Sequence, residues 1–176
     1  MYLFLSFQFV PLIGGAEKFL LYILEKITKK DKVILLTARF KSDLPKKELK
    51  GNLIIYRLRY IPLWIIGTLL FLIQLFFFLI VCHKKYNLIF INNPKYEAVL
   101  AILLAKIFHK KTILLITTTL CPRDILKENK TKFISFVSLI LKKADVFVVL
   151  TKEMESYLIE DRIPKKRIRI IPNGVD

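Results

Sequence analysis

Residues 144–176 have the sequence ADVFVVLTKEMESYLIEDRIPKKRIRIIPNGVD, and this stretch decides the fold. Val146 to Leu150 is an unbroken apolar run with the length of a buried strand. Thr151 follows where a helix N-cap is expected, with two glutamates in the first turn, and a proline later breaks the helix. Ile168 to Ile171 predicts a second short strand before the turn residues 172–174. The segment therefore predicts strand, helix, strand and turn.

The same alternation begins at the amino terminus. Tyr2 to Val10 predicts a buried strand, Pro11 to Gly15 a loop, and Ala16 begins a helix with apolar residues at helical spacing. Val33 to Thr37 predicts the next strand, and this β-loop-helix-β unit is typical of a doubly wound parallel sheet. Further strands are expected at Leu53–Leu58, Tyr86–Asn93 and Lys111–Ile116, helices at Pro94–Phe108 and Ile125–Lys143, and a polar surface loop at Phe40–Gly51. The fold class predicted is α/β with a parallel, Rossmann-like sheet flanked by helices.

Length, composition and charge narrow the class of protein. A chain of 176 residues suits one domain. Its 55% hydrophobic content, mean hydropathy of +0.48 and formal net charge of +16 favour an anionic membrane surface as a partner. Lysine-rich solvated faces are the plainer interpretation of the charge. A nucleic-acid partner is not expected, because the basic residues are scattered and no base-stacking motif accompanies them. Cys82 and Cys121 lack metal-site spacing, which fits a reducing compartment.

One stretch stands out for its apolar character. Ile61 to Cys82, IPLWIIGTLLFLIQLFFFLIVC, holds 22 residues without a charge, which is long enough to cross a bilayer as a helix. A span would place the strands before and after it on opposite sides of the membrane, although they are expected in one sheet. We therefore predict a helix that packs one side on the sheet and presents the other to lipid. Trp64, Phe77 and Phe78 are the residues expected to face the membrane.

The closing segment and the first loop together carry a resemblance to a known family. Residues 144–176 resemble the end of the N-terminal domain of family 4 glycosyltransferases of the GT-B fold, and FVPLIGGAEKFL at 9–20 is similar to that family's first loop. The resemblance implies that residues 1–171 form the N-terminal, acceptor-side domain. Residues 172–176 then begin the linker to a C-terminal donor-binding domain with an E-x7-E motif, which this sequence does not contain.

The resemblance also implies a site. Gly14 and Gly15 would contact the donor diphosphate, since backbone N–H groups at a helix N-terminus attract phosphate and glycine allows close approach. A plain tight turn is the alternative for these two glycines. After the strand 111–116 the family often has a histidine, whereas this chain has Thr117, Thr118 and Thr119. We expect Thr118 to bind substrate, although a hydroxyl cannot act as a base near neutral pH. Asn87 likewise replaces the family's usual aspartate.

The function implied by the resemblance is transfer of a sugar from a nucleotide-sugar donor to a glycan or lipid-linked acceptor. The expected enzyme is a cytoplasmic, peripheral membrane protein of hexosyltransferase type that needs no metal and no cofactor. The isolated chain is expected to be inactive, and a separate chain is one possible source of the second domain. The alternative is a non-catalytic, single-pass membrane protein anchored by a transmembrane helix at Ile61–Cys82.

Overall fold

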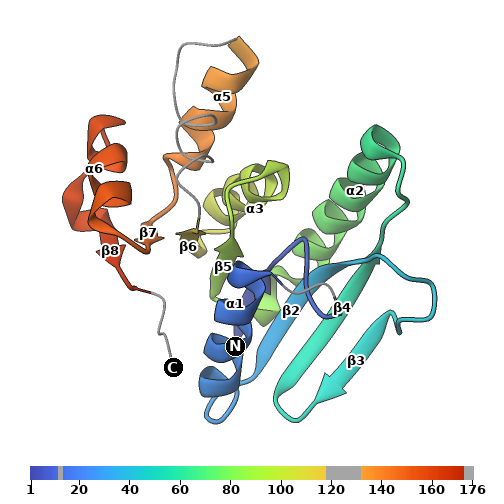
Figure 1. Cartoon of the computed structure of the whole chain (residues 1–176). Coiled ribbons are helices and arrows are strands. Elements are labelled where there is room, and N and C mark those ends of the chain that lie inside the picture. Colours follow the sequence, from blue (N-terminus) through green and yellow to red (C-terminus); the bar gives the residue numbers. More distant parts are fainter. Residues whose placement is uncertain (12–13, 118–131, 173–176) are drawn as a thin grey trace. The chain divides into compact units, whose positions relative to one another are not determined.

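The structure is a computed structural model that describes residues 1–11, 14–117 and 132–172, except for the side chains of residues 64 and 132–135 (Figure 1). The chain forms two compact units, residues 1–92 and residues 93–176. Each unit combines parallel strands with helices, which confirms the α/β class predicted from the alternating pattern.

The first unit is built on a sheet with β1 (Tyr2–Leu5) near its centre. β1 pairs in parallel with β2 (Val33–Arg39) on one side and with β5 (Leu88–Asn92) on the other. β4 (Leu53–Arg59) is parallel to β2, and β3 (Lys47–Lys50) runs antiparallel along the outer side of β4. The strand order in this unit is therefore β3-β4-β2-β1-β5.

The central strands are apolar on both faces because both faces are covered. Leu3, Leu35 and Ile89 are fully buried, and the rings of Phe4 and Phe90 stack with their centroids 4.8 Å apart. Strands of this kind appear in a sequence as continuous apolar runs without alternation, which is the pattern of a parallel sheet.

Two helices belong to this unit. α1 (Gly15–Ile27) buries Leu20 and Leu24, four residues apart, and exposes its polar side. α2 (Trp64–Cys82) follows β4, packs along it and ends in the single 3-10 turn His83–Lys85 (Figure 1). α2 is apolar on all sides. Its packing against β4 therefore decides which of its apolar side chains are buried and which are exposed.

The second unit has a parallel sheet of β6 (Lys111–Ile116), β7 (Val146–Val149) and β8 (Ile168–Ile170), in that order. Its helices are α3 (Tyr96–Ile107), α5 (Lys132–Leu141) and α6 (Lys152–Glu160), with a 3-10 turn at Lys165–Arg167. The Thr151 hydroxyl caps α6 by accepting from the N–H of Met154 at 3.2 Å, as the sequence predicts.

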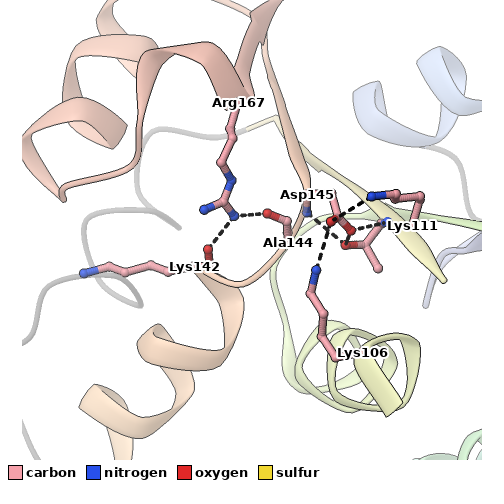
Figure 2. Close-up of polar contacts among 7 residues, drawn as sticks. Lys106, Lys111, Lys142, Ala144, Asp145 and Arg167 are labelled. Atoms are coloured by element: carbon pink, nitrogen blue, oxygen red, sulfur yellow. Dashed lines mark hydrogen bonds and ion pairs between the residues drawn. The ribbon is translucent and has the colours of Figure 1, made fainter. Parts of the chain in front are cut away.

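Polar side chains tie the strands and helices of this unit together (Figure 2). Asp145 accepts hydrogen bonds from the Lys106 ammonium and from the N–H and hydroxyl of Thr112, each at 2.9 Å. Arg167 donates to the backbone carbonyls of Lys142 and Ala144. These contacts connect α3, β6, β7 and the turn before β8, so the aspartate and arginine of the closing segment have structural roles.

Two sequence-based assignments need correction, and a third is only partly described. The first strand ends at Leu5 rather than Val10: Ser6 and Phe7 still bond the backbone of β2, and the Ser6 hydroxyl then donates to the Gln8 carbonyl where the chain turns. The expected loop 40–51 contains β3, whose single apolar residue gives no strand signal; its pairing is helped by Arg57, which donates to Glu48 at 2.7 Å. The expected helix 125–143 is α5 at Lys132–Leu141, and residues 125–131 lie outside the described part.

Candidate functional site

The order of strands in the first unit locates a candidate site. The chain passes from β1 to β2 and β4 on one side of the sheet, and returns to place β5 on the other side of β1. Between β1 and β5 the direction of winding reverses. In open α/β sheets, ligands bind outside the carboxyl ends of the strands at such a switch point. The residues that follow β1 and end β5 are therefore the candidates.

A buried polar pair occupies this position. Ser6, directly after β1, and Asn92, the last residue of β5, are 1% and 3% exposed. The Asn92 amide donates to the Ser6 hydroxyl at 2.9 Å, and that hydroxyl donates to the Gln8 carbonyl at 2.6 Å. The amide oxygen of Asn92 has no hydrogen-bond partner among the described residues. Because a buried acceptor without a partner is costly, it is suited to accept a hydrogen bond from a ligand hydroxyl.

The first loop ends at the same edge of the sheet. Gly14 is the N-cap of α1, and its N–H donates to the Glu17 carboxylate at 2.8 Å. A Cβ added to Gly14 would lie 2.7 Å from that carboxylate oxygen. The Glu17 carboxylate therefore accepts from the Gly14 N–H, and a side chain at position 14 would require only the end of the Glu17 side chain to move.

Gly15 differs from its neighbour. It is the first residue of α1, and a Cβ added there would meet no atom of the described residues within 4 Å. Its backbone angles are not in the left-handed region, so neither strain nor crowding by the described residues requires glycine. Close approach of a ligand to the backbone remains as a reason for glycine at this position.

Thr118 is the remaining residue predicted to bind substrate. Thr118 and the turn residue Gly174 lie outside the described residues. Thr117, next to Thr118, follows β6 in the second unit and donates its hydroxyl hydrogen to Asn93 at 2.6 Å. Thr117 is thus engaged in the structure of its own unit.

The pair of Ser6 and Asn92 offers binding rather than proton transfer. Ser6 and Asn92 do not titrate near neutral pH, and neither is a general base. The pair was missed by sequence reasoning, although two consecutive asparagines after a fully apolar strand are a usable signal.

Elsewhere, burial raises the pKa of the Glu97 carboxyl in α3 to about 7, while its own backbone N–H and Lys95 act to lower it.

The residues predicted to face a membrane lie on α2. Phe77 is 60% exposed. Phe78 is half-buried, and its ring packs on Tyr56 with the centroids 5.0 Å apart. Trp64 is the first residue of α2, and its side chain is not described. The structure thus places Phe77 on the exposed side of the helix and Phe78 against the sheet.

Comparison with known families gives the assignment. Residues 13–176 match the sequence model of glycosyltransferase family 4. The chain belongs to this family. The match includes Gly14 and Gly15 of the first loop, and it extends through the closing segment. The first loop and the closing segment are the two places that carried the resemblance in the sequence. No protein of curated function matches the sequence.

Solved structures agree with the fold of a family 4 N-terminal domain. Sucrose-phosphate synthase from Thermosynechococcus elongatus has a TM-score of 0.71 and 18% identity, and the match covers 99% of this chain and 48% of that one. HepE from Anabaena, in complex with UDP-glucose, has a TM-score of 0.64 and 16% identity, with 99% and 44% covered. The lipopolysaccharide outer core galactosyltransferase WaaB has a TM-score of 0.64 and 12% identity, with 100% and 46% covered. The family 4 chain spans less than half the length of each.

Proposed function

We propose that this family 4 chain is the acceptor-side part of a hexosyltransferase that moves a sugar from a nucleotide-sugar donor to a glycan or lipid-linked acceptor. Family membership over residues 13–176 is the observation that carries the proposal. Structural similarity to HepE, which was solved with UDP-glucose, supports a nucleotide-sugar donor.

The proposed enzyme includes a second, nucleotide-binding domain, in the same chain or in a separate one. Support comes from the coverage, since the chain matches only 44–48% of the three structures described. Residues 1–176 alone then bind acceptor but do not transfer sugar. Stabilisation of the leaving diphosphate is assigned to electrostatic groups of the second domain, without a metal ion or other cofactor.

Membrane association at the cytoplasmic surface is part of the proposal. The exposed apolar side of α2 supports it, together with the net charge of +16. In this setting a lipid-linked acceptor and the enzyme share one surface.

Gly15 offers a direct test in the enzyme assembled with its nucleotide-binding domain. Gly15→Ala adds a Cβ at the start of a helix where no described atom lies within 4 Å, so the melting temperature should stay equal or rise slightly. If the donor diphosphate approaches this backbone, the KM for the nucleotide sugar should rise by roughly tenfold or more, equal to about 1.4 kcal/mol of binding. UDP-glucose is the first donor to assay, followed by other nucleotide sugars.

Gly67 is the matched control, because there the chain itself requires glycine. A Cβ on Gly67 would overlap the carbonyl oxygen of Ile61, so Gly67→Ala should lower the melting temperature. Its KM for the donor should be unchanged at a temperature where the variant is folded. Donor kinetics unaffected by Gly15→Ala would show that the first loop is only a turn, and the assigned donor contact would be wrong.

A further inference from the structure

The side chains of α2 form two apolar stripes on opposite sides of the helix. The inner stripe is buried and repeats every four residues: Gly67, Phe71, Leu75 and Leu79. The outer stripe is exposed and has the same spacing: Ile65, Leu69, Ile73, Phe77 and Val81. Exposure along the outer stripe ranges from 46% at Ile73 to 76% at Ile65. A helix on a soluble surface normally places polar residues on that side, so the outer stripe needs a partner.

The inner stripe and its neighbours attach α2 firmly to its own sheet. The Phe71 ring meets Phe7 edge-on at 5.1 Å, and Phe78 packs on Tyr56. Gln74 accepts from the backbone N–H of Arg59 and donates to the Arg59 carbonyl, both at 2.9 Å, at the end of β4. These contacts run from the middle of the helix to its last turns, and they hold α2 along β4.

The topology of the first unit argues against a span. β4 immediately precedes α2 and β5 follows it, and both strands belong to one sheet through β2 and β1. A helix crossing the bilayer would place β4 and β5 on opposite sides and would break this sheet. The helix Ile65–Lys85 is nevertheless apolar and long enough to cross a membrane by length and composition, and only 22% of its most apolar stretch is buried. A core helix of the same composition would be mostly buried.

The charges around α2 suit an anionic surface. The exposed cations Arg59, Lys84 and Lys85 lie just before and just after the helix. Exposed Lys47 lies over the Tyr56 ring, 5.5 Å from its centroid, on the residue that packs against Phe78. The sequence has no aspartate or glutamate between Glu48 and Glu97. Glu48 itself is paired with Lys50 and Arg57. Within the described part of the chain, Arg59, Lys84 and Lys85 form no ion pair, which favours anionic lipid headgroups over a neutral partner.

We propose that α2 lies in the plane of one leaflet of an anionic bilayer, with the outer stripe immersed in lipid and the flanking cations among the headgroups. The immersed helix is about 28 Å long at 1.5 Å per residue, and its depth is roughly 5–10 Å below the headgroup boundary. This deepens the membrane association of the proposed function by naming the lipid class, the immersed residues and the orientation.

The orientation has a consequence for the acceptor, which rests on the proposed function. α2 begins just after the carboxyl end of β4, so its first turns, with Ile65 and Leu69, start from the carboxyl edge of the sheet. Ser6, Asn92 and the first loop belong to the same edge of this unit. The start of α2 and the switch point therefore lie at the same edge of this unit, which suits an acceptor carried by a lipid.

Flotation of the purified 176-residue chain with vesicles tests binding without any transfer assay. We expect the chain to float with vesicles of phosphatidylcholine and phosphatidylglycerol, and to bind pure phosphatidylcholine several-fold less. Ile73→Glu should reduce the partition coefficient by roughly tenfold or more. The matched control is Ile107→Glu, the same change at a 66% exposed isoleucine of α3, which should bind like the wild type. Circular dichroism and the melting temperature check that both variants are folded.

A relocated tryptophan distinguishes an in-plane helix from a span. Trp64 is the only tryptophan of the chain, so Trp64→Phe combined with Ile73→Trp places a single probe near the middle of α2. In-plane insertion predicts strong quenching by lipids brominated near the headgroup and weak quenching by lipids brominated near the chain ends. A span would reverse this order, since the middle of the helix would lie at the bilayer centre, about 15 Å deep.

Three results would overturn the proposal. They are no flotation with anionic vesicles, equal loss of binding in Ile73→Glu and Ile107→Glu, and deepest quenching at the bilayer centre. A dimer in gel filtration that Ile73→Glu separates, without vesicle binding, would identify the outer stripe as a contact between copies. Each result leaves the Gly15 test of the transferase unaffected, so failure of the membrane geometry and failure of the transferase assignment are distinguishable.

Discussion

The helices α2 and α3 are both apolar, but they differ in how their apolar surfaces are buried. Each follows a strand, and each is rich in apolar residues. α3 buries three alanines, Ala98, Ala101 and Ala105, at 0–1% exposure, and it carries Lys106 on its exposed side. α2 has one small buried residue, Gly67, and its exposed side is made of large apolar side chains. Small residues let α3 lie close to its surroundings, whereas α2 has more apolar surface than its sheet covers.

The difference teaches that apolar content alone does not say where a helix is buried. What matters is how side-chain size and polarity are distributed around the helix axis. Alanines at helical spacing indicate a helix that packs closely. An apolar helix without a polar side indicates surface that another partner must cover, because a monomeric soluble protein rarely exposes so large a patch. The outer stripe of α2 is such a surface.

Two leucines of α2 provide the largest expected contrast. Leu75→Ala removes a fully buried side chain of the inner stripe, and we expect a loss of about 2–5 kcal/mol of unfolding free energy. Leu69→Ala makes the same change at a residue that is 58% exposed, and it should cost under about 1 kcal/mol in detergent-free buffer. Urea denaturation of both variants measures the difference. Equal costs would mean that the outer stripe is covered within the chain, and the contrast with α3 would disappear.

Much of the fold could be predicted from local patterns. The strands at Leu53, Lys111 and Val146 begin where the sequence places them, because fully buried parallel strands appear as short apolar runs between breakers. β3 could not be found this way, since Lys47 to Lys50 has one apolar residue and depends on pairing with β4 and on the Glu48 ion pair. The end of β1 was missed because the Ser6 hydroxyl, which bonds the nearby Gln8 carbonyl, is also fixed by the amide of Asn92, 86 residues away.

The candidate site was only partly accessible from the sequence. The resemblance pointed to Gly14 and Gly15, and the structure distinguishes them: a Cβ on Gly14 would meet the Glu17 carboxylate, whereas a Cβ on Gly15 would meet no described atom within 4 Å. The partnership of Ser6 and Asn92 needs the strand order, because only the neighbouring positions of β1 and β5 bring them together. Periodicity cannot supply strand order.

The buried Glu97 in the first turn of α3 gives the next contrast, since no titratable carboxylate lies within α2. Its pKa of about 7 exceeds the ordinary value of 4.5, so the folded state binds the proton more tightly than the unfolded state. Stability is therefore lost as pH rises from about 4.5 to about 7. Glu97→Gln cannot ionise, and its gain over the wild type should be absent at about pH 4 and reach up to about 3 kcal/mol at about pH 8.

Thermal or urea unfolding of Glu97→Gln across this pH range measures the effect. Glu25→Gln, a change at an exposed residue of α1, controls for removal of a carboxylate in general. A gain that does not depend on pH would show that Glu97 is not held in its neutral form by burial, and that α3 tolerates a charge where its surroundings are apolar.

The smallest expected effect concerns the polar side of α3, which has no counterpart on the outer stripe of α2. Lys106 pairs with Asp145 at 2.9 Å but is 41% exposed, so Lys106→Met should cost under about 1 kcal/mol at neutral pH, and less in high salt. Burial acts to raise the pKa of Asp145, yet hydrogen bonds from Lys106 and Thr112 outweigh it and hold the pKa below its ordinary value. The pair therefore stabilises the fold at pH values above that ordinary pKa, and the contribution is lost as pH falls through the lowered pKa.

Lys111→Met is the matched control, because Lys111 lies 4.0 Å from Asp145 and is 77% exposed, and it should have no measurable cost. A loss of unfolding free energy for Lys106→Met that exceeds about 1 kcal/mol and does not change with salt concentration would mean that the methylene chain of Lys106, rather than its charge, holds α3 in place.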